Sequence, residues 1–297
     1  AIDISELIKK LDEISSVNIV GGFLNFNLSD EFFSKLLELS FETKNFGMKS
    51  VTKSSETTLI EFSSPNTNKP LHLGHIRNNL LGNAIANIFN SSGHNVKKVQ
   101  VINDRGIHVC KSMLAWLKFG KGKTPSSENI KGDLFVGSFY VLFEKILKEE
   151  KNKINDKNIV PNILKEAQEL LLKWEKRDPE VIDLWKKMNE WVYDGMDETY
   201  KKLGITFDKN YYESDTYLVG KSIVNEFLLK NIFFKKSDKS IWVDLNEYNL
   251  DEKLLLRSDG TAVYMTQDIG TAFKRYEDFS FDNMIYVTGS EQIYHFQ

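Results

Sequence analysis

The sequence has little cysteine, little proline and no long apolar run, and these absences exclude several classes of protein. Cys110 is the one cysteine in 297 residues, so no internal disulfide can form, and with only His108 near it the spacing of a zinc site is missing. No apolar run approaches the roughly 20 residues that span a bilayer, and the first residues do not form a signal peptide. We therefore expect a cytoplasmic protein with no membrane partner.

A strong charge of either sign is also lacking. The chain carries 39 Lys and Arg against 42 Asp and Glu, a formal net charge of −3, which argues against a uniformly basic binder of nucleic acid. A local basic face would not alter this sum, so nucleic-acid binding stays open. Hydrophobic residues make up 41% of the chain, enough for one large domain with an appendage or for two domains.

The most informative stretch is residues 61–75, EFSSPNTNKPLHLGH. Leu59, Ile60 and Phe62 predict a strand, and the two prolines that follow end it. A long helix is predicted from Gly74. Its apolar face is expected to contain Ile76, Leu80, Leu81, Ala84, Ile85, Ile88 and Phe89.

A helix that begins directly after a strand offers backbone N–H groups and a positive dipole end to a phosphate. His72 and His75 add donors at that end, and Gly74 leaves room for a flat base against the backbone. The alternative is an ordinary helix start with two solvated histidines, which is the better interpretation of an isolated four-residue match. The preceding strand and following helix favour the nucleotide.

A second strand, Val96–Ile102, follows the helix and completes a β-α-β unit. Such a connection is almost always right-handed, so the predicted fold class is α/β, with a parallel sheet of Rossmann type. The next loop contains Asp104, for which we predict the role of a turn residue.

Before this unit, residues 4–14 predict an amphipathic helix. A hairpin of Val17–Val20 and Phe23–Leu28 is predicted next, with one apolar face inward. Ser29 is expected to cap a further helix, whose inward side chains would be Phe32, Phe33, Leu36 and Leu37.

Residues 120–203 predict a helical insertion, with helices at 134–151, from Pro161 to about Lys176, and from Asp178 to Gly204. Trp174, Trp185 and Trp191 could form a base-stacking set, but tryptophans at helical spacing are far more often core residues. A strand at Ile205–Phe207, a polar loop at residues 212–215 and a hairpin of residues 233–236 and 241–245 are expected to follow.

The second informative run is residues 254–270, LLLRSDGTAVYMTQDIG, which predicts a strand, a turn and a helix. Tyr264 and Asp268 are four residues apart on that helix and share a face, so they could enclose a guanidinium group. By spacing alone, an ordinary surface Tyr–Asp pair is the better interpretation. The last predicted strand, residues 284–288, leads into Gly289 and Gln292.

These two runs, together with residues 212–215 and the end of the chain, resemble segments of class I aminoacyl-tRNA synthetases. Residues 61–66, which precede the histidines, are similar to the corresponding residues of arginyl-tRNA synthetases. The resemblance extends over about residues 15–297. It implies that His72, Gly74, His75 and Gly289 take part in ATP binding, with the two histidines also catalytic. It further implies that Glu61, Tyr264 and Asp268 face the guanidinium of arginine, while Asn66 and Gln292 hold its α-amino and carboxylate groups.

The same resemblance implies an arginine–tRNA ligase that uses ATP, with Mg²⁺ expected on the ATP, L-arginine and tRNA(Arg), and that is a monomer. Residues 1–50 resemble part of the additional N-terminal domain that contacts tRNA, although a piece that only packs on the core is an equal alternative. Residues 51–297 would be the catalytic domain.

The second, lysine-rich signature of class I enzymes and an anticodon-binding domain are missing, so we expect a fragment, which alone could be inactive. Lys69 is a candidate for the cationic help that this signature supplies; its alternative is a solvated loop lysine. Two rival functions stay open: a small-molecule adenylyltransferase of the same fold, and a truncated module that binds without turnover.

Overall fold

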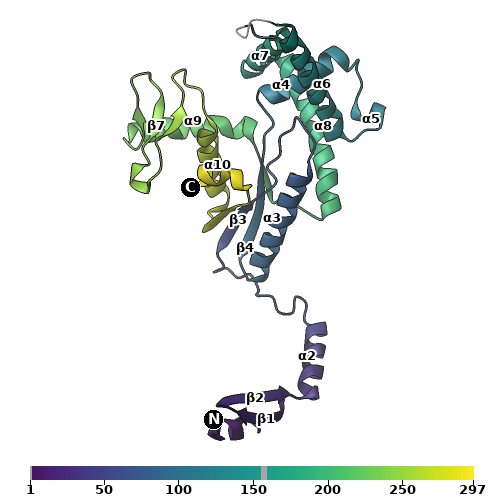
Figure 1. Ribbon diagram of the computed structural model, residues 1–297, viewed down its shortest axis with the longest axis vertical. Coiled ribbons are helices and arrows are strands. Elements are labelled where there is room, and N and C mark those ends of the chain that lie inside the picture. Colours follow the sequence, from purple (N-terminus) through teal and green to yellow (C-terminus); the bar gives the residue numbers. More distant parts are fainter. Residues whose placement is uncertain (1, 155–158) are drawn as a thin grey trace. The chain divides into compact units, whose positions relative to one another are not determined.

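The computed structural model describes residues 2–154 and 159–297 (Figure 1). The chain forms two compact units, one made of residues 1–50 with 91–93 and the other of residues 51–90 with 94–297.

The first unit contains a helix, a hairpin and a second helix. These elements are α1 (Ile2–Ile8), β1 (Ile14–Val20), β2 (Phe23–Leu28) and α2 (Asp30–Glu42). The predicted hairpin is confirmed, with Gly21 and Gly22 at positive φ in its turn and the strands antiparallel. The Ser29 hydroxyl accepts a hydrogen bond from the Phe32 N–H, so the predicted cap is also confirmed.

Two predictions for this unit are wrong. The first helix ends at Ile8 rather than Ile14, because Ile14 pairs with Leu28 in the hairpin and strand pairing overrides the helical spacing. On α2, Phe33 and Leu37 are 55% and 71% exposed instead of inward. Figure 1 shows α2 running away from the hairpin, so no sheet face is available to cover these side chains.

The second unit is built on a four-stranded sheet in the order β5-β4-β3-β9, and every neighbouring pair in it is parallel. The strands are β3 (Thr57–Glu61), β4 (Asn95–Ile102), β5 (Lys209–Tyr212) and β9 (Asn283–Tyr286). The predicted Rossmann-type sheet is therefore confirmed. From β3 the chain moves to one side through β4 and β5 and returns to the other side as β9, so the strand order reverses beside β3. Open α/β sheets bind ligands at the carboxyl ends of strands flanking such a point.

The helix that connects β3 to β4 is α3 (Leu73–Ser91), and its packed face overlaps only in part with the one predicted: Ile85 and Phe89 pack against the core as expected. Its buried residues are Asn79, Gly82 and Ala86, whereas Leu80 and Ile88 are 50% and 64% exposed. Gly82 explains the difference. A Cβ atom at this position would lie 2.3 Å from the Phe62 ring, so the missing side chain lets that ring lie directly against the helix.

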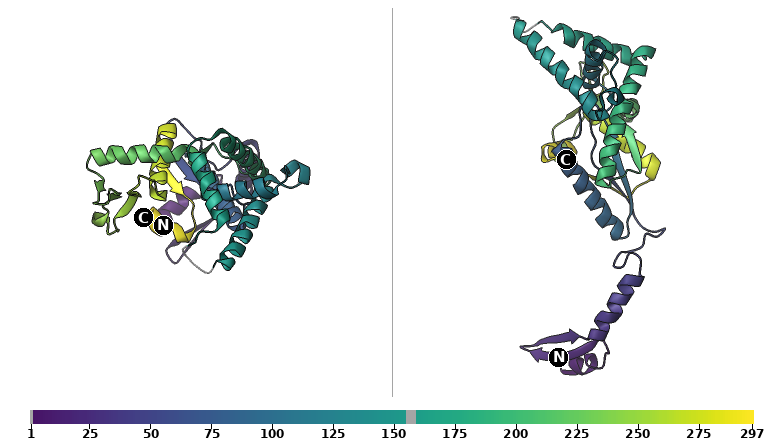
Figure 2. Two further views of the ribbon diagram at one scale, coloured as in Figure 1. Left: turned by 90° about the horizontal axis from the view of Figure 1, so that it is seen from above. Right: turned by 90° about the vertical axis from the view of Figure 1, so that its right-hand side faces the viewer.

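A helical bundle stands at the end of the sheet where β4 leads into α4 (Figures 1 and 2). It contains α4 (Ile107–Phe119), the short α5 (Pro125–Glu128), α6 (Gly132–Lys153), α7 (Asn162–Glu175) and α8 (Pro179–Leu203). The predicted helices are confirmed, although the bundle begins at Ile107, before the predicted boundary at 120. Asp178 caps α8, and Gly204 ends it at a φ of +67°.

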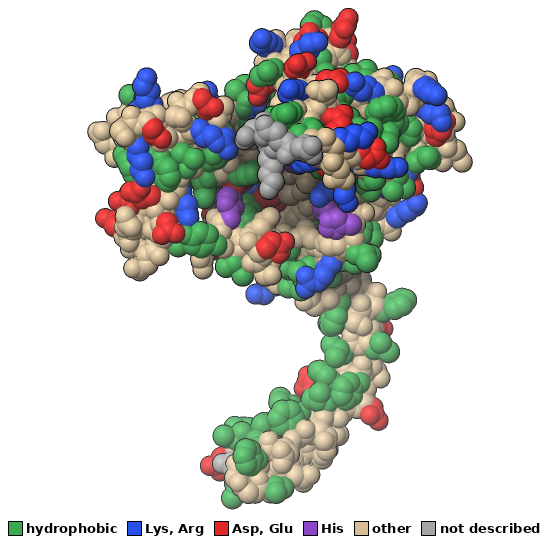
Figure 3. All heavy atoms as spheres, turned by 45° about the horizontal axis from the view of Figure 1, so that its top comes forward, with side chains coloured by type: hydrophobic (Ala, Val, Ile, Leu, Met, Phe, Trp, Pro, Cys, Tyr) green, Lys and Arg blue, Asp and Glu red, His purple; other side chains and the backbone are tan. Residues whose placement is uncertain are grey.

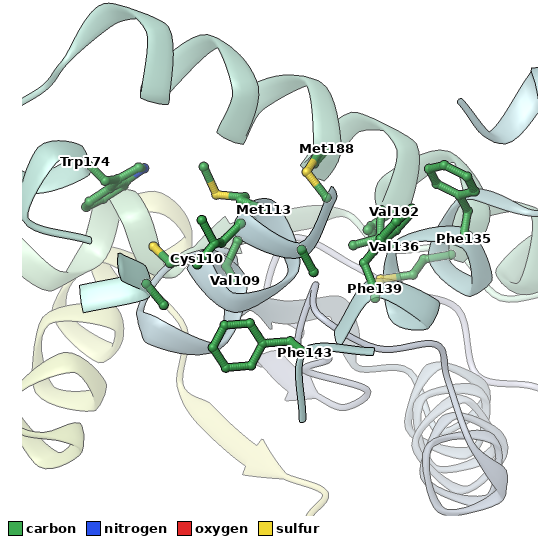
Figure 4. Close-up of a cluster of buried hydrophobic side chains, with 14 of the residues drawn as sticks. Val109, Cys110, Met113, Phe135, Val136, Phe139, Phe143, Trp174, Met188 and Val192 are labelled. Carbon is green, nitrogen blue, oxygen red and sulfur yellow. The ribbon is translucent and has the colours of Figure 1, made fainter. Parts of the chain in front are cut away.

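The main hydrophobic core lies between these helices. Figure 4 shows Val109, Cys110 and Met113 of α4 facing side chains of α6, α7 and α8. Trp174 is 1% exposed within this cluster, and Trp185 and Trp191 pack against it, so the prediction that the tryptophans are core residues is confirmed.

The second half of the unit corrects two expectations. Ile205–Phe207 is not a strand: Ile205 is buried against the helical core, and β5 begins later, at Lys209. The expected polar loop at residues 212–215 is instead the last residue of β5, Tyr212, and the start of α9 (Glu213–Leu229). The predicted hairpin is confirmed as β6 (Phe234–Lys235) and β7 (Ile241–Val243), which β8 (Lys253–Leu256) extends to a three-stranded antiparallel sheet.

The remaining elements are the 3-10 helix η1 (Asn246–Tyr248), α10 (Tyr264–Phe279), the 3-10 helix η2 (Ser290–Gln292) and α11 (Ile293–Phe296). Helices α9 and α10 cross at two glycines: a Cβ at Gly220 would lie 1.9 Å from the Thr266 carbonyl oxygen, and one at Gly270 would lie 2.4 Å from the Gly220 nitrogen. This close approach fixes α10 beside the sheet. Among the described residues, no helix has the length and apolar character that crossing a membrane requires.

Candidate active site

A cleft of about 860 Å³ lies at the carboxyl ends of β3 and β9, where the strand order reverses. The face drawn in Figure 3 is hollowed, with histidine side chains on two sides of the hollow. The structure brings every sequence-predicted site residue to the wall of this cleft. These residues are Glu61, Asn66, Lys69, His72, Gly74, His75, Tyr264, Asp268, Gly289 and Gln292. Their individual roles stay predictions.

One end of the cleft is formed by the start of α3 and its two histidines, whose ring centroids are 3.9 Å apart. The backbone N–H of His72 donates to Nδ1 of His75 at 3.2 Å, and the Gly74 N–H donates to Nδ1 of His72 at 3.1 Å. Nδ1 of His75 is therefore the acceptor, which places the ring hydrogen on Nε2. A Cβ at Gly74 would lie 2.9 Å from the His72 ring, so glycine permits this turn.

His75 is neutral at pH 7. Partial burial lowers its pKa to about 4, and the positive charges of His72 and Lys69 add to this shift. This end of the cleft therefore presents neutral hydrogen-bond donors, the helix dipole, and the cationic side chains of Lys69 and Arg77.

The opposite end is acidic. Asp268 of α10 is 2.5 Å from Nε2 of His295. Desolvation by the cleft walls raises the pKa of the Asp268 carboxyl, and the contact with His295 opposes that rise. Glu61, at the end of β3, is 2.6 Å from Nη1 of Arg275 through Oε2, and its Oε1 accepts a hydrogen bond of 2.6 Å from the Ser64 hydroxyl.

Sequence reasoning missed Arg275 and His295. Arg275 follows Asp268 by seven residues on α10, so the two share a face, and an arginine on the inward face of an otherwise amphipathic helix was a usable signal. His295 offered no comparable signal, because its contact with Asp268 is formed by a turn near the end of the sequence.

The predicted amino-acid ligands differ in how they are held. Asn66 forms a parallel bridge with Asn103, which extends the β3–β4 pairing into the loop and fixes the backbone at this point. Gln292 lies in η2. Tyr264 is the first residue of α10, is 76% exposed and lines the cleft.

Asp104 is not the turn residue that the sequence predicts. It is 1% exposed, and its carboxylate accepts hydrogen bonds from the Ser214 N–H at 2.9 Å and the Ser214 hydroxyl at 2.7 Å. Burial raises its pKa. Because Ser214 lies in the first turn of α9, Asp104 caps that helix from the loop after β4 and thereby positions Glu213 in the cleft wall.

No group of three or more His, Cys, Asp or Glu side chains suited to a metal occurs within residues 2–154 and 159–297. Burial raises the pKa of the Cys110 thiol to about 12, which disfavours the thiolate that a metal would need.

Comparisons with known proteins agree on one family. The family model described as tRNA synthetases class I (R), catalytic domain, matches residues 38–297. The arginine–tRNA ligase of Bacteroides thetaiotaomicron is 53% identical over 96% of this chain and 49% of its own length, and that of Amoebophilus asiaticus is 50% identical over 96% and 48%. The chain thus spans about half the length of the curated relatives it matches.

Solved structures show the same fold. The arginyl-tRNA synthetase of Plasmodium falciparum has a TM-score of 0.66 at 21% identity and covers 99% of this chain and 50% of its own. That of Thermus thermophilus has a TM-score of 0.58 at 24% identity and covers 91% and 44%. Because the family model extends over residues 38–297, the chain belongs to the class I tRNA synthetases, in the family of the arginine (R) catalytic domain.

Proposed function

We propose that this chain carries the site at which an arginine–tRNA ligase activates L-arginine with ATP and transfers it to tRNA(Arg). The observation that carries the proposal is the division of one cleft into an acidic end, at Asp268 and Glu61, and a phosphate-binding end, at the start of α3. An amino acid with a cationic side chain and a nucleotide with anionic phosphates would each find complementary charge, with their reacting groups between the two ends.

In the first step a carboxylate oxygen of arginine attacks the α-phosphorus of ATP. The bond from that phosphorus to the bridging oxygen of the β-phosphate breaks, so arginyl-adenylate forms and pyrophosphate leaves. Negative charge accumulates on the phosphate oxygens, and donors that are already oriented stabilise it most effectively. The backbone at the start of α3, Nε2 of His75, and the charge of Lys69 would supply this stabilisation.

In the second step a ribose hydroxyl of the terminal adenosine of tRNA attacks the carbonyl carbon of the adenylate, and AMP leaves. Mg²⁺ bound to the ATP phosphates would neutralise part of their charge. We further propose that the protein is a monomer and works in the cytoplasm, where tRNA is aminoacylated. Residues 1–50 would contact the tRNA.

Specificity for arginine is assigned to Asp268. A carboxylate can accept two parallel N–H bonds from a guanidinium, whereas the ammonium of lysine is a point charge. Tyr264, four residues earlier on α10 and largely exposed, would cover the guanidinium once it is bound, while Asn66 and Gln292 would hold the α-amino and carboxylate groups.

Calorimetric titration of the chain with L-arginine tests this proposal, with L-lysine and L-glutamine as controls. Arginine is expected to bind and the two controls are not. A folded chain that binds none of the three, or binds lysine as well as arginine, would contradict the assigned specificity. Retained ATP binding under those conditions would favour the rival, an adenylyltransferase for another small molecule.

A further inference from the structure

Arg275 is a fully buried charged side chain beside the cleft, and it is not one of the residues that line the cleft. It is 1% exposed, and its Nη1 is 2.6 Å from Glu61, whose side chain is 14% exposed and does line the cleft. A buried guanidinium is costly unless it is paired, so this contact is expected to be persistent. Arg275 therefore lies behind Glu61 as seen from the ligand.

The surroundings of Arg275 hold it in place. Its guanidinium carbon is 5.3 Å from the ring centroid of Tyr211 and 5.7 Å from that of Tyr286, so the group lies between side chains of β5 and β9. The second oxygen of Glu61 accepts from the Ser64 hydroxyl, and the same hydroxyl oxygen accepts from the Val101 N–H at 3.2 Å. Glu61 is thus held by partners from α10 and the loop after β3.

The Glu61–Arg275 pair changes the balance of charge among the carboxylates that line the cleft. Four carboxylates line the cleft, those of Glu61, Glu213, Asp268 and Glu291. Glu213 has Arg105 at 3.9 Å as well as a hydrogen bond of 2.9 Å from Gln267, so Glu61 and Glu213 each face a guanidinium of the protein. The Glu291 carboxylate lies beside Gly289, which is predicted to bind ATP. Among the residues described, the imidazole of His295 is the one cationic group within ion-pair distance of Asp268.

We propose that Arg275 is a positioning and specificity residue of the arginine site: by neutralising Glu61 it leaves Asp268 as the carboxylate to which a guanidinium ligand binds. This inference rests on the proposed function. It also changes the role that family resemblance gives Glu61, which becomes a fixed, neutralised wall of the pocket and not the main partner of the substrate's charge.

A double-mutant cycle separates this role from direct binding by Glu61. Glu61→Gln leaves the buried Arg275 charge unpaired beside the pocket, which should weaken arginine binding about 30-fold or more. Combining Glu61→Gln with Arg275→Met removes both charges and should restore the dissociation constant to within about fivefold of the original. ATP affinity serves as the folding control and should change less than about twofold in each variant.

Two further variants use the same titrations. Arg275→Met alone adds one uncompensated negative charge to the pocket and should lower the preference for arginine over lysine about tenfold. Arg275→Lys keeps the charge and should restore most of that preference. If the double variant binds arginine as weakly as Glu61→Gln, or if Arg275→Met keeps the preference of the unaltered chain, the inference is wrong.

Failure of the proposed function gives a different pattern. In that case the unaltered chain does not bind arginine, or Asp268→Asn binds it as well as the unaltered chain does. The double-mutant cycle then has no reference dissociation constant. Normal binding by the unaltered chain, loss in Asp268→Asn, and no coupling between Glu61 and Arg275 would overturn the role of Arg275 alone.

Discussion

The two ends of the cleft gather charges of opposite sign, and repulsion between like charges is reduced differently at each end. At the acidic end, carboxylates are brought together and the protein's own guanidinium groups offset most of their charge, as with Glu61 and Arg275. At the α3 end, cationic side chains gather around two histidines, and His75 avoids further repulsion by being neutral, with a pKa of about 4.

This difference indicates what each end can do before any ligand arrives. The acidic end is preorganised by ion pairs within the wall, so its selectivity depends on the helix that carries both Asp268 and Arg275. The α3 end is preorganised by backbone geometry, because its donors are N–H groups of a turn and a helix start. Changes to side chains or helix packing should therefore affect the two ends independently.

The largest effect on stability is expected from moving α10. In Gly220→Ala the new Cβ would meet the Thr266 carbonyl oxygen at 1.9 Å, and backbone cannot yield cheaply, so unfolding free energy should fall by about 3 kcal/mol. Arginine binding should weaken more than about tenfold while ATP binding changes little. Denaturant unfolding and calorimetry measure both effects.

Ser222→Ala, at an exposed position of α9, the helix that contains Gly220, is the matched control. It should change neither the unfolding free energy nor arginine binding. Equal losses of arginine and ATP affinity in Gly220→Ala would show that the two ends are not independent.

At the opposite end, Lys69→Met should weaken ATP binding about tenfold, the value of one charge-assisted contact to phosphate. Arginine binding should be unaffected, because Lys69 lies with the α3 histidines. Lys121→Met, in an exposed loop, provides the control for loss of one positive charge. An unchanged ATP dissociation constant would identify Lys69 as a solvated loop lysine.

Asp104 offers a smaller, structural test, because it caps α9 without lining the cleft. Asp104→Asn keeps the shape but replaces an acceptor oxygen with a donor facing the two Ser214 donors, so stability should fall by about 1 to 2 kcal/mol. Its pKa is raised on folding, so the native carboxyl holds its proton more tightly than the unfolded one.

The contribution of that carboxyl to stability is therefore greatest at low pH and is lost as pH rises above its ordinary value of 3.8. The stability difference between the original chain and Asp104→Asn should shrink over this range in denaturant titrations. A difference that grows with pH would contradict the burial that raises this pKa.

The smallest expected effect concerns His75. Its pKa is lowered from 6.5 to about 4 on folding, so the native state binds fewer protons than the unfolded state between these values. Stability should be fully present above pH 6.5 and decline as the pH falls toward 4. His75→Gln should show a shallower decline in unfolding midpoint between pH 7 and pH 5, and identical slopes would mean that His75 titrates normally.

Much of this site could be predicted from the sequence because its parts are local. The strand, turn and helix around residues 57–91 follow from periodicity and proline placement, and parallel pairing follows from the connecting helix. Gly289 and Gln292 meet the residues of the first informative run because the carboxyl ends of β3 and β9 are neighbours.

What the sequence did not predict depends on distant partners. The Glu61–Arg275 pair joins residues more than 200 positions apart, and the burial of Asp104 depends on Ser214 of another element. The predicted buried face of α3 was wrong in part, because the helix lies against Phe62 through a glycine rather than through its larger apolar residues Leu80 and Ile88. Such contacts are set by packing between elements, which periodicity within one element does not contain.

The central claim, that one cleft holds a cationic amino acid at one end and a nucleotide at the other, is tested most directly by a crossed titration. Asp268→Asn and His75→Ala are each titrated with L-arginine and with ATP. We predict that Asp268→Asn loses arginine binding about 100-fold with ATP affinity within about twofold, and that His75→Ala weakens ATP binding alone. Equal loss of both ligands in either variant would contradict the account.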